Sequence, residues 1–146
     1  MFAFRRIVVL MVVAGFLLTA CGGQTATETQ NKVEVQITLT EFGINSSVTE
    51  FKTGVPYHFV VTNAGLVEHE FMIMPPLTQD QMGMHMDMTD LDKMALAMIE
   101  GSSLQAGNSS SVDITFTEPA GSGELEFACH TPGHYESNMK LPIVVE

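Results

Sequence analysis

Apolar and polar residues alternate along several short segments of this chain, which is the period-two pattern of half-buried β-strands. The clearest example runs from Val33 to Leu39, where every second residue is apolar. The expected strands cover residues 33–39, 42–44, 48–51, 57–62, 70–74, 112–116, 125–127 and 139–145. Pro142 in the last of these predicts an edge or a bulge, because proline cannot donate to a ladder. Short strands separated by turn residues favour an all-β, Greek-key β-sandwich.

Residues 77–108 interrupt the strand pattern with a helical one. Apolar residues recur there at three- and four-residue spacing, at Leu91, Met94, Ala95, Met98 and Ile99. Thr89 followed by Asp92 resembles a capping box with Asp in place of Glu, and Gly101 is placed as a C-terminal cap. We therefore expect a helix of about three turns inside a Met-rich insertion, lying on the sandwich.

The N-terminus has the form of a bacterial lipoprotein signal. Arg5 and Arg6 precede the uncharged run 7–18, which is too short for a comfortable membrane span. The run leads into Leu-Thr-Ala-Cys, which resembles a lipobox ending at Cys21. We expect residues 1–20 to be a signal peptide and Cys21 to be lipidated, holding the protein on a bacterial membrane outside the cytoplasm. An uncleaved anchor helix and a conventional cleavage are the alternatives.

Charge and composition describe the remainder of the chain. Residues 21–32 are small and polar and predict a flexible tether, and residues 33–146 suit one compact domain. The formal net charge is −11, and it becomes −13 when the two signal-peptide arginines are removed. Such a chain repels nucleic acid and anionic lipid, so neither is an expected ligand. The negative charge serves solubility, or steers the protein toward a basic docking face on a partner.

A metal-ligating pattern lies near the C-terminus. Cys129, His134 and Met139 form a C-x4-H-x4-M motif. Copper accepts a trigonal His2Cys set with a weak axial Met, whereas zinc gains little from a thioether. The motif supplies only one imidazole at this spacing, and His69, which follows a turn and precedes an apolar run, is the candidate for the second. With Cys21 acylated, Cys129 has no disulfide partner, and its alternative role is that of a buried, inert thiol.

The histidine after an Asn-x-Gly turn and the C-x4-H-x4-M loop before the last strand identify a family. On these motifs residues 33–146 resemble the cupredoxins, the small blue copper proteins, with a loop length similar to that of azurin, auracyanin and rusticyanin. The resemblance implies one mononuclear type 1 copper held by His69, Cys129, His134 and axial Met139. It also implies that the electron leaves through His134, at an apolar patch for which Leu66, Pro132 and Met139 are candidates. Asn63 and amide groups near Cys129 are expected to support the ligands.

Methionines form a second cluster in the insertion. Every second residue is a methionine at Met82, Met84, Met86 and Met88, with His85 between them. Thioethers bind Cu(I), so this run is a possible secondary Cu(I) site. Methionine is also an adaptable apolar residue, so packing or contact with a partner is the alternative.

Two further histidines lie outside these motifs. His130 follows Cys129 directly, so it points to the opposite face of the strand end and is expected at the surface. His58 lies in an alternating segment and is expected to be structural or exposed.

Together these features predict a membrane-tethered, extracytoplasmic blue copper protein that carries single electrons between extracytoplasmic redox proteins. The alternative is a copper storage, delivery or tolerance protein that uses the Met-rich segment. An enzyme such as a nitrite reductase or an oxidase requires a second copper centre rich in histidine, and five histidines in the chain make this a poor fit.

Overall fold

The computed structural model describes residues 31–83 and 86–146. The expected signal peptide, Cys21, nearly all of the expected tether, Met84 and His85 lie outside the described residues. Within the described ranges no helix is both long enough and apolar enough to cross a membrane.

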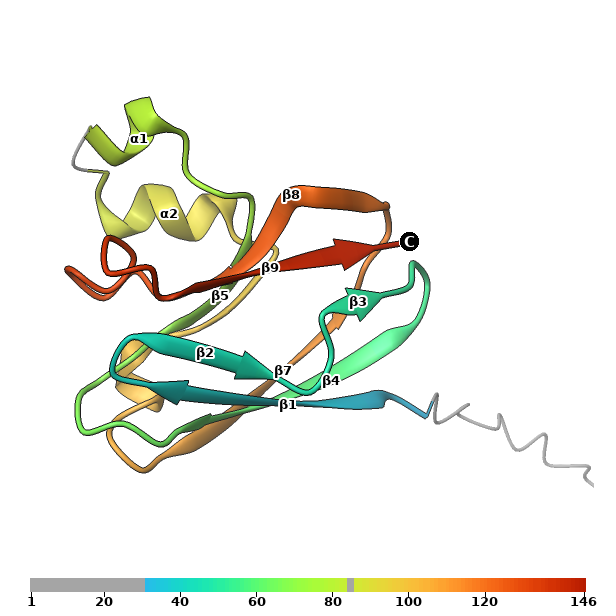
Figure 1. The fold of residues 1–146 in the computed structure, drawn as a ribbon. Coiled ribbons are helices and arrows are strands. Elements are labelled where there is room, and N and C mark those ends of the chain that lie inside the picture. The colour runs from blue at the N-terminus through green and yellow to red at the C-terminus, as the bar shows by residue number, and fades with distance from the viewer. Residues whose placement is uncertain (1–30, 84–85) are drawn as a thin grey trace, which may run out of the picture.

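Two β-sheets pack face to face, as the alternating pattern predicted (Figure 1). The first has the order β2-β1-β4-β7 and contains β1 (Val33–Thr40), β2 (Gly43–Ser46), β4 (Pro56–Asn63) and β7 (Ser109–Thr115). The second has the order β3-β9-β8-β5-β6 and contains β3 (Glu50–Phe51), β5 (Phe71–Met74), β6 (Ala97–Ile99), β8 (Ala120–Ala128) and β9 (Lys140–Val145). Strand β1 runs parallel to β4, and β3 runs parallel to β9, so the chain crosses between the sheets.

The core between the sheets follows from the same alternation. Val35, Ile37 and Leu39 of β1 are buried, while the polar residues between them are exposed. Phenylalanine rings meet across the interface between the sheets. The rings of Phe59 and Phe127, one from each sheet, pack edge to face with their centroids 5.7 Å apart. Burial of these apolar side chains is the main force that holds the two sheets together.

Pro142 lies where the structure leaves one side of β9 free. It pairs with Glu126 of β8, whereas β3 pairs only with Val144 and Val145. A proline is tolerated there because the missing donor breaks no ladder on that side. Strand β9 therefore has a free edge only around Pro142, while the end of the strand is paired on both sides.

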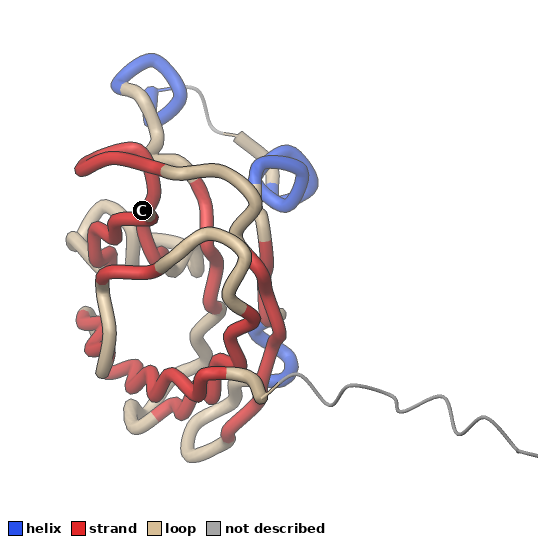
Figure 2. The backbone as a smooth tube through the Cα atoms, turned by 90° about the vertical axis from the view of Figure 1, so that its right-hand side faces the viewer, coloured by secondary structure: helices blue, strands red, loops and turns tan. Residues whose placement is uncertain are grey.

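The predicted three-turn helix is wrong in its extent. Helices α1 (Gln79–Gly83) and α2 (Met88–Met94) lie outside the sheets, and a 3₁₀ turn, η1, covers Gly101–Ser103 (Figures 1 and 2). Helix α2 ends at Met94 because Ala95 is already extended, and the next apolar residues form β6, antiparallel to β5. Its N-cap is Asp87, whose side chain accepts from the amide of Asp90, rather than Thr89; Gly101 opens η1 instead of capping the helix.

The apolar face that suggested the longer helix is nevertheless buried as one cluster. Leu91 packs, together with Met94, Ala95 and Met98, against Met72 and Met74 of β5. Three of these residues reach the cluster from α2 and its C-cap, and Met98 reaches it from a strand. A short apolar run can form either a helix or a strand, and here pairing with β5 makes the residues around Met98 a strand.

Candidate metal centre

The four residues expected to bind metal come from two places in the fold. His69 lies in the loop between β4 and β5, and Cys129 directly follows β8. His134 and Met139 lie in the loop that leads to β9. All four side chains are buried. The structure thus brings an early histidine to a late loop, as the sequence predicted.

The loop is closed by its own backbone. The amide of Cys129 donates to the carbonyl of Met139 at 3.2 Å, and the amide of Met139 donates to the carbonyl of His134 at 3.0 Å. Because β8 and β9 pair directly below, these bonds hold the ends of the loop together. Main-chain hydrogen bonds therefore help to position the side chains of Cys129 and His134.

Three ligand atoms form a small buried triangle. Nδ1 of His69 lies 3.1 Å from Nδ1 of His134, and Sγ of Cys129 lies 3.9 Å and 3.5 Å from these two nitrogens. A point equidistant from the three atoms lies about 2 Å from each, close to the bond lengths of metal–imidazole and metal–thiolate pairs. The triangle therefore fits one metal ion. Met139 is wholly buried in the same core cluster as Cys129, and its role as axial ligand stays a prediction.

The protonation of these groups suits metal binding. Burial, and secondarily the charge of His134, lower the pKa of His69, so its ring is neutral and can act as a ligand. Burial raises the pKa of the Cys129 thiol, while hydrogen bonds from Thr131 and from the backbone amide of Glu70 oppose that rise. A bound cation would displace the thiol proton, and the same hydrogen bonds would then stabilise the thiolate.

Asn63 supports His69 through the turn that precedes it. Its side-chain amide donates to the carbonyls of Val67 at 2.7 Å and Leu104 at 2.8 Å, and its oxygen accepts from the amide of Gly65 at 2.8 Å. A Cβ atom at Gly65 would lie 3.0 Å from Nε2 of His69, so a larger residue there would press on the imidazole. Asn63 thus acts on the ligand through the backbone.

The surface near His134 is apolar, with one change from expectation. The His134 ring packs edge to face with Phe42 at 5.7 Å, and Phe42 is 59% exposed. Leu66 is 86% exposed and Pro132 is also exposed, as expected for patch residues. Met139 is wholly buried, so its expected contribution to the patch is wrong. Phe42 was not among the expected patch residues, because its only signal in the sequence is an aromatic residue beside a turn.

His130 is buried, and the expectation that it lies at the surface is wrong. It is 8% exposed, its ring stacks on Tyr135 with centroids 4.3 Å apart, and its backbone amide donates to the carboxyl of Glu70 at 2.7 Å. Burial lowers the pKa of His130 to about 4 and raises the pKa of Glu70 to about 7. The expectation for His58 is confirmed: its ring is partly exposed and hydrogen-bonds Asp113 at 2.7 Å.

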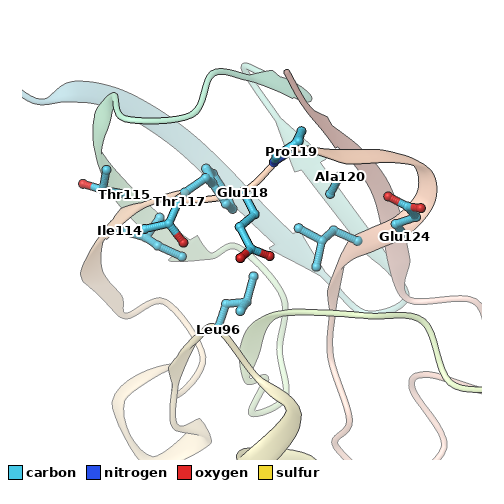
Figure 3. A pocket seen from close by; sticks show the side chains of 10 residues that line it. Leu96, Ile114, Thr115, Thr117, Glu118, Pro119, Ala120 and Glu124 are labelled. Carbon is cyan, nitrogen blue, oxygen red and sulfur yellow. The ribbon is translucent and has the colours of Figure 1, made fainter.

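The described part of the methionine run lines a cavity. Met82, Met86, Met88 and His130 lie around one cavity of about 430 Å³. A second cavity of about 330 Å³ lies elsewhere, between Leu96 and the segment 114–125 (Figure 3). No thiol, thioether or imidazole lines that second cavity, so it offers no soft metal ligands.

Comparison with known proteins gives one sequence relative of stated function. No family model matches the chain. The copper-resistant cuproprotein CopI of Rubrivivax gelatinosus is 32% identical over 94 residues, which are 64% of this chain and 54% of that protein. The chain therefore spans about half the length of this curated relative.

Solved structures match over most of the chain. Reduced auracyanin from Roseiflexus castenholzii superposes with a TM-score of 0.60 at 19% identity, over 79% of this chain and 98% of that one. Auracyanin B superposes with a TM-score of 0.60 at 20% identity, over 82% of this chain and 91% of that one. An azurin from Methylomonas sp. strain J gives 0.51 at 16% identity, over 78% and 98%. At these identities the likenesses show a shared fold.

Proposed function

Since the chain has the cupredoxin fold, we propose that it is a blue copper protein that carries single electrons through one type 1 copper ion. His69, Cys129 and His134 are the proposed in-plane ligands, and Met139 is the proposed axial ligand. The observation that carries the proposal is the buried triangle of two Nδ1 atoms and one Sγ, whose size fits a single ion. This set of two histidines, one cysteine and one methionine is consistent with a single type 1 copper site.

Copper bound here supplies a one-electron couple. The protein's part is to keep the ligands still, since movement of ligands on each electron transfer slows the reaction. The hydrogen bond between Cys129 and Met139 closes the loop, and Asn63 holds the turn of His69. Both supports are hydrogen bonds to backbone carbonyls, which do not depend on the charge of the ion.

The proposed route for the electron is the His134 ring. It is nearly buried, but Phe42, Leu66 and Pro132 expose apolar surface on the loops around the site. A partner can approach an apolar patch closely because little water has to be displaced from polar groups. The net charge of −11 favours extracytoplasmic redox partners with a basic docking face.

Membrane attachment and the absence of enzymatic activity complete the proposal. The lipobox-like sequence ending at Cys21 supports a lipid anchor on the extracytoplasmic side of a bacterial membrane. A carrier needs only one redox centre, and the described residues contain one cluster of His and Cys able to hold a metal. We therefore propose an electron carrier rather than a nitrite reductase or an oxidase.

A copper storage, delivery or tolerance role is the second candidate, because CopI is described as a copper-resistant cuproprotein. The two functions differ in how the protein treats Cu(I). We expect a carrier to show rapid electron self-exchange, measured by NMR line broadening in mixtures of the two oxidation states. We also expect it to keep its copper when the reduced protein meets a Cu(I) chelator. Slow exchange together with rapid loss of Cu(I) to the chelator would contradict the carrier and support delivery.

A further inference from the structure

The cavity beneath the helical insertion combines three thioethers with one imidazole. Met82 lies in α1, Met86 between the helices, and Met88 at the start of α2. His130 lines the same cavity from the start of the loop that follows β8. Soft thioether ligands favour Cu(I), and imidazole is also a ligand that copper accepts. This group of residues is separate from the triangle of His69, Cys129 and His134.

The imidazole of His130 is held in place with one nitrogen unused. Its ring stacks on Tyr135, whose hydroxyl donates to Glu126 at 2.6 Å and accepts from the amide of Leu77 at 3.1 Å. Nε2 of His130 is buried and has no hydrogen-bond partner among the described residues. A buried polar atom without a partner destabilises the folded protein. His130 thus lines the cavity and carries one buried, unsatisfied nitrogen, which a bound ligand would satisfy.

Two of the methionines around this cavity, Met82 and Met88, contribute little to the core, whereas Met86 is partly buried against the cluster beneath α2. Met72 and Met74 are wholly buried and fill the space beneath α2. By contrast, Met82 is 48% exposed and Met88 is 39% exposed. Apolar side chains left this exposed contribute little to folding, so their sulfur atoms are available for another purpose.

The charges around the cavity favour a cation. Asp87 and Glu136 lie on its wall. An adjoining cavity shares Met88 and Pro132 with it. The carboxyl groups on the wall of that adjoining cavity belong to Glu68, Glu70, Asp92 and Glu100. Ionised carboxyl groups around a cavity raise the local concentration of cations.

We propose that this cavity binds a second copper ion as Cu(I), with Nε2 of His130 and the thioethers of Met82, Met86 and Met88 as ligands. The site differs from a Cu(I) site made by the methionine run alone, because its fixed element is a histidine far away in the sequence. It binds copper independently of the type 1 site, and it would give a copper-handling protein a second holding position.

The test uses the full chain, with the type 1 site first filled with one equivalent of copper and reduced. Anaerobic titration with Cu(I) in the presence of a coloured Cu(I) chelator then measures any further binding. We expect the unchanged protein to take up a second Cu(I). We expect His130→Phe, which keeps an aromatic ring on Tyr135, to bind that second ion at least tenfold more weakly. Binding of the second Cu(I) with unchanged affinity in His130→Phe would overturn the proposal.

Two further variants keep the test decisive if His130→Phe folds poorly in a thermal melt. The triple variant Met82→Leu/Met86→Leu/Met88→Leu preserves apolar volume and should lose the second ion to the same degree. Met72→Leu, at a buried methionine outside the cavity, is the matched control and should keep it. If the triple variant keeps the second ion, or if Met84→Leu/His85→Gln loses it while His130→Phe keeps it, the cavity site is rejected.

The outcome is distinct from that of the type 1 proposal. The visible absorption of the first equivalent, recorded in the oxidised protein, reports on the type 1 site alone. A protein with that absorption and only one bound Cu(I) would refute the cavity site and leave the proposed electron carrier intact. A protein without that absorption, but with His130-dependent Cu(I) binding, would refute the carrier and support the cavity site.

Discussion

The carboxyl group of Glu70 accepts a hydrogen bond from the backbone amide of His130 at 2.7 Å. Each of these residues directly follows a proposed ligand, His69 or Cys129, so the bond ties the two ligand-bearing segments together. In return, the backbone amide of Glu70 hydrogen-bonds the sulfur of Cys129 and opposes the rise in its pKa. This pairing helps to hold residues that are far apart in the chain around one point.

The titration of Glu70 and His130 should make the stability of the metal-free protein depend on pH. Folding raises the pKa of Glu70 from 4.5 to about 7. Between these two pH values the folded protein holds a proton that the unfolded chain has lost, so this group makes stability fall as the pH rises. Folding lowers the pKa of His130 from 6.5 to about 4. Between these two pH values the unfolded chain holds a proton that the folded protein lacks, so this group makes stability fall as the pH drops. Between pH 4.5 and 6.5 the two effects oppose one another.

Substitution of Glu70 and substitution of His130 should therefore change the slope of the unfolding free energy against pH in opposite directions. Relative to the unchanged protein, Glu70→Gln should make the free energy of unfolding increase more steeply with pH, by up to about 1.4 kcal/mol per pH unit. His130→Phe should make it decrease more steeply by a similar amount. Urea unfolding at several pH values between 4.5 and 6.5 measures both slopes. Slopes that shift in the same direction in both variants would contradict the assignment.

Substitution of the two cysteines should separate the metal site from the membrane anchor. Cys129→Ser should abolish the intense visible absorption, because that absorption requires a thiolate bound to Cu(II). Cys21→Ser should leave the absorption intact and move the protein from the membrane fraction to the soluble fraction of a bacterial cell. Absorption spectra and fractionation with immunoblotting check the two results. A full visible band in Cys129→Ser would exclude Cys129 as a ligand.

Met139→Leu tests the proposed axial ligand. The side chain is wholly buried, and leucine is close to methionine in volume, so the fold should be retained. Copper should remain bound while the reduction potential rises by about 60 mV or more, a tenfold change in the redox equilibrium, since the oxidised state loses more from removal of the thioether. Voltammetry of the purified protein gives the value. An unchanged potential would mean that Met139 is not the axial ligand.

Gly65→Ala should disturb the site without touching a ligand. The added Cβ would lie 3.0 Å from Nε2 of His69 and 3.2 Å from the side-chain oxygen of Asn63, so the imidazole has to move. We expect copper affinity to fall about tenfold or more, as for the loss of other groups that orient a metal ligand. Gly121→Ala is the matched control, because the nearest atom to its added Cβ lies at an ordinary 3.5 Å. Equal affinities in the two variants would show that the turn does not position His69.

The sandwich could be predicted because its signal is local. In β1, Val35, Ile37 and Leu39 alternate with polar residues, and the two faces of the strand have correspondingly different burial. The helical insertion shows the limit of such reasoning. Residues near Met98 fit a helical spacing equally well, and only pairing with β5, distant in sequence, made them a strand.

The cluster of His69, Cys129 and His134 could be predicted because their residue types and spacing are chemically restrictive. Their supports could not. The bond between Glu70 and His130 joins residues that no local pattern connects, and the burial of His130 depends on Tyr135 and on helices whose positions the sequence did not give. Phe42 reaches His134 only because β1 and β2 place their turn beside the site.

The most direct test of the central claim is a Cu(II) titration of the purified protein, with the visible spectrum recorded at each addition. We predict an intense blue or green charge-transfer band that saturates at one copper per chain, as the triangle of His69, Cys129 and His134 requires. Copper that binds without this band, or only after several equivalents, would contradict a type 1 site and leave copper storage or delivery as the function.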